Sequence, residues 1–121
     1  MRDKFLEHGI PYDNIDPEMR ELIDVLNFHL GFTTRFCCYG HDDWTSPYVI
    51  FDDSVRDEQI YSLASVVCKD WKDFIHFNKW VRNRGGEVAS SWTMDIRKLF
   101  KNDTPAKLQH LKRVVEVFKS V

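Results

Sequence analysis

Most of the residue types that can do chemistry gather in one short segment of the chain. In sequence order they are Arg35, Cys37, Cys38, Tyr39, Gly40, His41 and Trp44. A thiol and an imidazole are metal ligands, and together they also make a nucleophile and its base. Arginine, histidine and a turn glycine suit a small anion, because guanidinium presents its donors in a fixed fork and glycine allows close backbone approach. The segment therefore offers a metal centre, a thiol active site or an anion pocket.

A metal centre would use Cys37, Cys38 and His41, with His29 or Cys68 as a fourth ligand. Neighbouring residues of a strand point to opposite faces, so adjacent cysteines seldom bind one ion. The sequence also has no Cys-x-x-Cys pair, which is the commonest zinc-ligand spacing. We therefore expect one cysteine to be buried and the other to lie at the sheet surface, with no metal and no other cofactor.

A thiol active site would pair Cys38 with His41, and Asp42 or Asp43 would orient the histidine. The cysteine is not placed in a strained strand-to-helix turn of the kind that presents many nucleophiles. We therefore expect His41 to be a turn residue or a ligand contact and the protein not to be an enzyme. A small Cys/His-dependent hydrolase or phosphodiesterase acting on a nucleotide signal is the alternative.

An anion pocket is the interpretation that the residue types favour. Arg35, His41, Arg97 and Lys98 would meet if the first and last strands share a sheet, and Tyr39 and Trp44 would stack on a base. The sequence has no Walker loop and no Gly-x-Gly-x-x-Gly, so ordinary nucleotide folds are not indicated. The candidate ligand-binding residues are therefore Arg35, Tyr39, Gly40, His41, Trp44, Arg97 and Lys98. Trp92 is expected in the core.

Three strands are predicted to position these residues. Residues 32–39 are rich in Thr, Phe and Tyr, and alternation places Thr34, Phe36 and Cys38 on one face. A loop over residues 40–47 leads to a second strand at 48–52, and the short connection favours an antiparallel pair. Residues 87–97 alternate between apolar and polar side chains and form the third strand.

Helices account for most of the remaining chain. Asp16 and Pro17 begin a helix that ends before Gly31, a second helix runs from about Val55 to Arg82, and Thr104 and Pro105 begin the last one. Residues 1–15 form an N-terminal arm. The order helix-strand-strand-helix-strand-helix predicts a single α+β domain over residues 1–121. Its helices pack on one face of a small, mainly antiparallel sheet, and the other face is left for a ligand or a second subunit.

Composition limits the class of partner. The 121 residues are 43% hydrophobic, which is enough for a core, and 17 Lys and Arg face 19 Asp and Glu. This balance argues against a nucleic-acid polymer or a membrane as partner. Three cysteines, two of them adjacent, make a poor disulfide framework and indicate the cytoplasm. Open sheet edges, with Phe77 and Trp80 beyond the helix's apolar stripe, predict a homo-oligomer, a dimer or higher.

One segment also carries a family resemblance. Residues 36–41, Phe-Cys-Cys-Tyr-Gly-His, followed by Pro-Tyr-Val-Ile-Phe at 47–51, resemble the small phage proteins of the Thoeris anti-defence family, first type. The resemblance implies a sponge protein in the host bacterial cytoplasm. Such a protein sequesters cyclic ADP-ribose isomers, such as glycocyclic ADP-ribose, made by bacterial TIR-domain proteins. It does not cleave them, and it thereby blocks Thoeris immunity. The resemblance also implies a homo-oligomer with ligand pockets near the subunit contacts. Some members of the family also bind cyclic oligonucleotide signals at separate sites.

Overall fold

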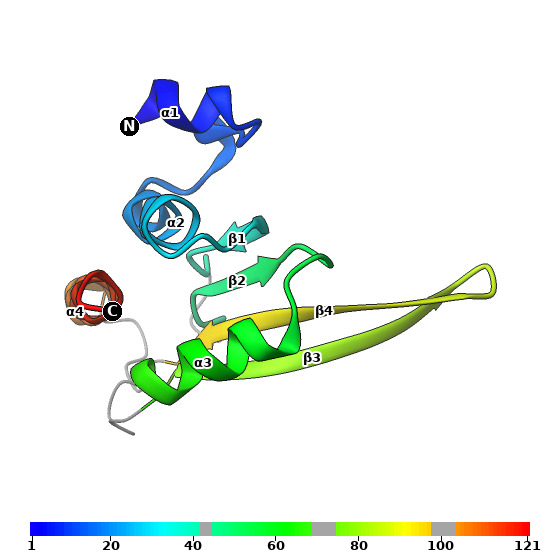
Figure 1. The fold of residues 1–121 in the computed structure, drawn as a ribbon. Helices are drawn as coiled ribbons and strands as arrows, with labels where there is room; N and C mark the ends of the chain where they lie inside the picture. Colours follow the sequence, from blue (N-terminus) through cyan, green and yellow to red (C-terminus); the bar gives the residue numbers. More distant parts are fainter. Residues whose placement is uncertain (42–44, 69–74, 98–103) are drawn as a thin grey trace.

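In the computed structural model of this α+β protein, the described residues form a sheet of four antiparallel strands in the order β1-β2-β4-β3 (Figure 1). The structure describes residues 1–41, 45–68, 75–97 and 104–121. The strands are β1 (Thr34–Cys38), β2 (Tyr48–Phe51), β3 (Ile75–Arg84) and β4 (Glu87–Ile96). The edges of the sheet are therefore β1 and β3, and the predicted pairing of β1 with β2 is confirmed.

The helices follow the predicted periodicity for most of their length. They are α1 (Arg2–Glu7), η1 (Tyr12–Asn14), a continuous helical segment of η2 (Pro17–Met19), α2 (Arg20–Asp24) and η3 (Val25–His29), then α3 (Asp57–Val67) and α4 (Thr104–Lys119). Pro17 is the first residue of its helical segment, and Gly31 follows the end with a left-handed φ of 75°. The predicted helices at the start and end of the domain are confirmed. The N-terminal arm contains α1 and is held down by Phe5, which is fully buried.

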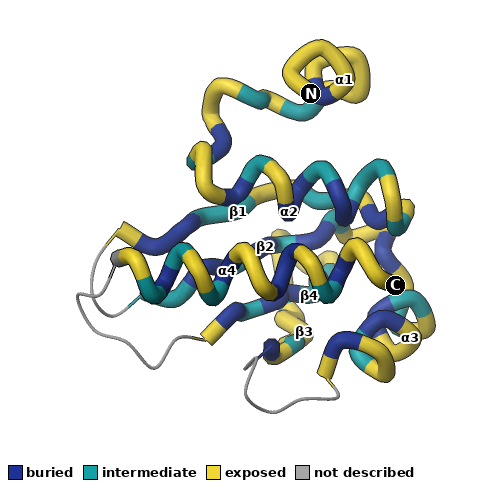
Figure 2. Tube along the Cα trace, turned by 90° about the vertical axis from the view of Figure 1, so that its left-hand side faces the viewer, coloured by how far each residue is buried: buried dark blue, intermediate teal, exposed yellow. Residues whose placement is uncertain are grey.

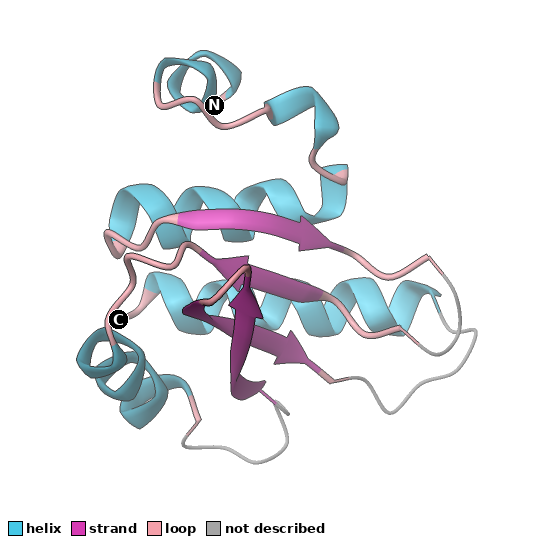
Figure 3. Ribbon diagram, turned by 90° about the vertical axis from the view of Figure 1, so that its right-hand side faces the viewer, coloured by secondary structure: helices cyan, strands magenta, loops and turns pink. Residues whose placement is uncertain are grey.

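The helices α2, α3 and α4 pack on the same side of the sheet. The face turned toward them carries Val49, Phe51, Met94 and Ile96, all fully buried, and these contact a core built mainly from the helices (Figure 2). In Figure 3 the sheet lies in front of α2 and α4, and its other face is uncovered. Phe36, on that face, is 55% exposed. The predicted arrangement of helices on one face of the sheet is confirmed. Burial of the apolar helix stripes against that face stabilises this arrangement.

The predicted long helix from Val55 to Arg82 is wrong. Helix α3 ends at Val67, and Ile75–Arg84 form strand β3, which was not predicted from the sequence. Gly85 and Gly86 have φ of 60° and 92° and link Arg84 to its partner Glu87 in a two-residue turn. A hairpin turn of this kind needs positive φ at both central residues, which glycine adopts without strain. The glycines therefore connect two strands, and the basic residues before them do not end a helix.

The β3–β4 hairpin extends beyond the rest of the sheet (Figure 1). Strand β2 pairs with β4 only over residues 93–95, whereas β3 pairs with β4 over its whole length. Near the middle of the hairpin, the Asp57 carboxylate accepts hydrogen bonds from Lys79 Nζ and Trp92 Nε1, both at 2.9 Å. Trp92 packs partly buried against the core, as expected. The outer half of the hairpin is a two-stranded ribbon, in which the buried Ser91 accepts a hydrogen bond from Arg82.

A bulge interrupts β1 and changes which side chains share a face. Thr34 lies opposite Phe51, but the register shifts before Phe36, which lies opposite Ile50. Thr34 therefore shares the helix-covered face with Cys37, and the predicted grouping of Thr34 with Phe36 and Cys38 is wrong. An extra residue in one strand of a pair reverses the alternation beyond it.

Candidate functional site

A cavity of about 640 Å³ lies between the N-terminal arm, the segment α2–η3 and β1. This volume is within the range of roughly 300–1,000 Å³ that is usual for small-molecule sites. Apolar side chains form much of the wall, and a few polar groups reach into it. The apolar lining includes Ile10, Ile15, Phe28, Phe32 and Phe36, and the polar lining includes His8, Asn14, Asn27, Arg35 and Asp52. The mixture is typical of a site for a ligand with a ring system and several polar groups.

Local hydrogen bonds fix two walls of the cavity against each other. The Asn27 amide donates to the Ile23 carbonyl oxygen at 2.9 Å and to Thr34 Oγ1 at 2.8 Å, and it accepts from the Thr34 backbone N–H. These bonds tie the end of the first long helical segment to the start of β1. Because β1 is an edge strand, its outer edge faces the cavity without a neighbouring strand. Edge-strand backbone groups can bind polar ligand atoms.

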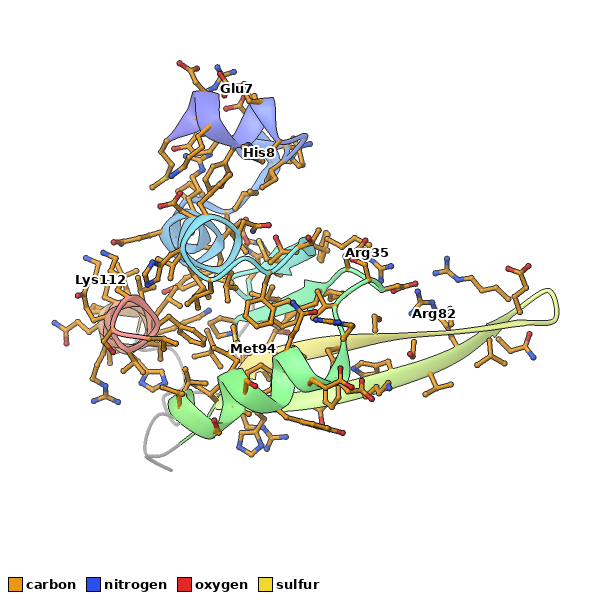
Figure 4. All side chains as sticks on the ribbon, in the orientation of Figure 1. Glu7, His8, Arg35, Arg82, Met94 and Lys112 are labelled. Carbon is orange, nitrogen blue, oxygen red and sulfur yellow. The ribbon has the colours of Figure 1, made fainter. Side chains whose placement is uncertain are left out.

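Of the predicted ligand-binding residues that the structure describes, Arg35 lines this cavity. Its Nη1 lies 3.2 Å from Asp53 Oδ1, and the Arg82 Nη2 binds the same carboxylate at 2.8 Å. Figure 4 shows Arg35 and Arg82 on the side of the molecule toward which the hairpin projects. The Arg35 side chain is 41% exposed. A guanidinium has five N–H donors, so one contact to Asp53 leaves donors for an anion.

The other predicted residues lie away from Arg35. Tyr39, Gly40 and His41 follow the opposite end of β1, and this five-residue strand is about 13 Å from end to end at roughly 3.3 Å per residue. Arg97 is exposed and follows β4 at that same end, where the Ile96 N–H donates to the Pro47 carbonyl oxygen. Trp44 and Lys98 lie outside the described residues. The structure therefore does not bring Arg35 together with His41 and Arg97 in one pocket.

Tyr39 and Gly40 make contacts within the protein. The Lys107 Nζ donates to the Gly40 carbonyl oxygen at 2.7 Å and lies 4.0 Å from the centre of the Tyr39 ring. Burial raises the pKa of the Tyr39 phenol. Gly40 has a φ of 88°, and a Cβ there would lie 2.2 Å from the Thr45 carbonyl oxygen. The glycine is thus required for close approach to the protein's own backbone, whereas the sequence suggested approach to a ligand.

A second constellation forms around His41. Ligand atoms of Asp16, Cys38 and His41 all lie within 4.8 Å of one another. The Asp16 Oδ2 accepts a hydrogen bond from the Tyr39 N–H at 2.8 Å and lies 3.2 Å from His41 Nε2. The Gly40 N–H donates to the Cys38 sulfur at 3.3 Å. The strand end and the following turn therefore place a thiol, an imidazole and a carboxylate side by side.

The other candidate ligands are elsewhere. Cys37 packs against the core on the face opposite Cys38, and burial raises the pKa of its thiol to about 12. The two cysteines lie on opposite faces as predicted, but both are half-buried, so the expectation of one buried and one surface cysteine is wrong. His29 contacts the Val121 carbonyl oxygen, and the Cys68 thiol contacts that of Ile75.

Sequence reasoning missed Asp16 as a site residue. Its place before Pro17 indicated a helix cap, but its side chain makes no capping hydrogen bond. It binds the end of β1 instead, at positions more than twenty residues further along the chain. No local sequence signal marks a contact of that range.

The fold and the cavity define a small α+β protein with a ligand-sized site beside an edge strand. A family model described as YoqC prophage protein matches residues 3–121, so the chain belongs to the YoqC prophage protein family. Comparison with curated proteins gave no match, and neither did comparison with solved structures. Among the described residues, none of the helices has the length and apolar character needed to cross a bilayer.

Proposed function

We propose that this prophage protein captures a cyclic ADP-ribose isomer and holds it without cleaving it. The observation that carries the proposal is the 640 Å³ cavity with Arg35 in its wall. The resemblance of residues 36–41 and 47–51 to the Thoeris anti-defence family supports this class of ligand, and the match to a prophage family agrees with a role in infected bacteria. The host bacterial cytoplasm, where TIR-domain proteins make the signal, is the proposed place of action.

The cavity wall offers a partner for each part of such a ligand. Arg35 binds the pyrophosphate, because a guanidinium matches two phosphate oxygens at once. Phe28 and Phe32 pack against the adenine ring. Asn14 and His8 form hydrogen bonds with ribose hydroxyl groups. Cyclic oligonucleotides present the same phosphate, ribose and base chemistry and are a second ligand class to test.

Two ionisable groups of the cavity, Cys37 and Asp52, favour holding a ligand over converting it. Burial keeps the Cys37 thiol protonated, with its pKa raised to about 12, so it is a poor nucleophile. Hydrogen bonds from Ser54 lower the pKa of Asp52, so this carboxyl stays ionised and does not act as a general acid at neutral pH. Sequestration needs slow release and no turnover, and this lining suits both.

A specific observation supports a second candidate function. Cys38, His41 and Asp16 lie within reach of one another, and this combination can form a thiol, base and orienting carboxylate. Asp16 then takes the role that the sequence assigned to Asp42 or Asp43, which lie outside the described residues. In this alternative the protein is a small hydrolase or phosphodiesterase that acts on the same class of signal.

One experiment separates these functions. The protein is purified from cells that make cyclic ADP-ribose isomers, denatured by heat, and the released small molecules are identified by mass spectrometry. Recovery of an intact cyclic isomer supports capture. Recovery of a linear product supports the hydrolase. Recovery of no nucleotide, together with a protein that co-purifies, would instead indicate an inhibitor that acts by binding another protein.

A further inference from the structure

We propose that Asp16, Cys38 and His41 form a binding site for a divalent transition metal ion of the zinc type. Their ligand atoms already lie within 4.8 Å of one another. Ligands of a tetrahedral zinc ion at about 2.0–2.3 Å from the metal are themselves separated by roughly 3–4 Å, so a small side-chain adjustment closes the site. A carboxylate, a thiolate and an imidazole are all ligands that zinc accepts.

The backbone around the cluster is arranged as metal sites require. Cys38 and His41 are separated by two residues, and the turn between them contains Gly40 in a left-handed conformation. This turn directs the Gly40 N–H at the Cys38 sulfur, at 3.3 Å. Such a hydrogen bond stabilises a thiolate and fixes its direction. Outer hydrogen bonds of this kind orient metal ligands and raise affinity.

The third ligand is fixed in the same way. The Tyr39 N–H donates to Asp16 Oδ2 at 2.8 Å, which holds the carboxylate beside His41 Nε2. Asp16 is only 24% exposed in its side chain, whereas His41 is 72% exposed. The exposed His41 imidazole therefore gives an ion access to the cluster from solvent.

The sequence predicted no metal site, because the candidate ligands there were Cys37 and Cys38 together, and adjacent strand residues point to opposite faces. In the structure Cys37 lies on the core face of the sheet, and Asp16, from a distant part of the chain, lies beside Cys38 and His41. The proposed ion would clamp the segment before η2 to the turn after β1. The site is independent of the proposed ligand capture, because none of its three ligands lines the cavity.

The test is metal binding by the purified full chain with Zn²⁺ and Co²⁺ as probes. We expect close to one Zn²⁺ per chain, and a Co²⁺ form with a thiolate-to-cobalt charge-transfer band. Cys38→Ser should abolish this band. His41→Ala and Asp16→Asn should each weaken affinity by about 100-fold or more, beyond the 10- to 100-fold typical of outer-shell changes. The matched controls Cys37→Ser and Cys68→Ser should keep both the stoichiometry and the band.

Three results would overturn the proposal. They are absence of Zn²⁺ binding at micromolar concentration, a cobalt–thiolate band that survives Cys38→Ser, and loss of the band in Cys68→Ser, which would show adventitious binding at that exposed thiol. Should Cys38→Ser fail to fold by circular dichroism, His41→Ala decides the matter, because the exposed His41 contributes little to the core. Unchanged affinity in that variant also contradicts the site.

Discussion

Lys107 in the last helix donates a 2.7 Å hydrogen bond from Nζ to the backbone carbonyl oxygen of Gly40. The same ammonium lies 4.0 Å from the centre of the Tyr39 ring. Lys107 is only 7% exposed, so this cation is satisfied almost entirely by the protein. The contact ties α4 to the end of β1 and to the turn that carries His41. The geometry of the cysteine–histidine cluster therefore depends on a helix from the far end of the chain.

The first prediction follows from this contact. Lys107→Met should keep the aliphatic stem but remove the donor, and leave the Gly40 carbonyl unsatisfied. The free energy of unfolding should fall by about 1–3 kcal/mol. Urea denaturation monitored by circular dichroism measures the change. Lys112→Met, an exposed lysine of the same helix (Figure 4), is the control and should change stability little. Equal effects of the two substitutions would contradict the assigned role of Lys107.

The second prediction separates the two arginines that the sequence treated alike. Arg35→Ala should weaken binding of a cyclic ADP-ribose isomer by about 1.5–3 kcal/mol, or roughly ten- to a hundredfold in Kd, because it removes a charge-assisted contact to phosphate. Arg97→Ala should bind like the parent, because Arg97 lies at the opposite end of the sheet. Calorimetric titration measures both.

Arg35→Ala also removes the ion pair between Arg35 and Asp53, and this loss is the main competing explanation for weaker ligand binding by that variant. Arg82→Lys tests it, because Arg82 shares Asp53 but does not line the cavity. If Arg97→Ala weakens binding while Arg35→Ala does not, the ligand lies near the turn after β1 and the cavity is not its site.

The third prediction concerns acid stability. The Asp57 carboxyl has a lowered pKa, first because of its hydrogen bond from Lys79 and second because of that from Trp92. A group whose pKa is lowered on folding stabilises the protein above its unfolded pKa of about 4 and loses that contribution as the pH falls further. Asp57→Asn should therefore lower the thermal midpoint at pH 7, and the difference from the parent should shrink at low pH. A constant difference between pH 7 and pH 3 would exclude this linkage.

The fourth prediction concerns self-association. The outer hairpin exposes Trp80 by 62% and Val81 by 66% on the edge strand β3, and Val88 by 71% on the part of β4 that does not pair with β2. We expect light scattering to give at least twice the chain mass of 14.4 kDa. Trp80→Lys should reduce the mass toward that of one chain, because a charge opposes burial of this edge. Val66→Lys, on the exposed side of α3, is the control. A parent protein that is monomeric at micromolar concentration would rule out the interface.

Local patterns predicted much of the fold. The stripe of the first long helix, the alternation of residues 87–97 and the Thr-Pro start of the last helix each correspond to an observed element. The strand β3 was missed because Phe77 and Trp80 continue the apolar content of α3 without a local stop signal before Ile75. Gly85 and Gly86 indicate that β3 precedes them, because a Gly-Gly pair between two segments rich in β-forming residues is typical of a hairpin turn.

The site was predictable only in part. Arg35 and His41 were selected as ligand contacts from residue type and spacing, whereas Cys38 was considered only within metal and thiol sites that the sequence did not favour. The separation of Arg35 from His41 along β1 was not predicted. An alternating sequence pattern shows which face of the sheet a residue occupies, but it does not show where along the sheet a ligand fits. Asp16 and the cavity wall from the N-terminal arm depend on contacts between distant parts of the chain. Such contacts leave no period in the sequence.

The most direct test of capture without conversion is a binding and recovery measurement. The protein is incubated with cyclic ADP-ribose isomers, unbound ligand is removed by filtration, and the retained fraction is denatured and analysed by liquid chromatography with mass spectrometry. We predict that close to one cyclic isomer per chain returns chemically unchanged, even after prolonged incubation. A steady appearance of linear ADP-ribose, at a rate that depends on protein concentration, would contradict the proposed function.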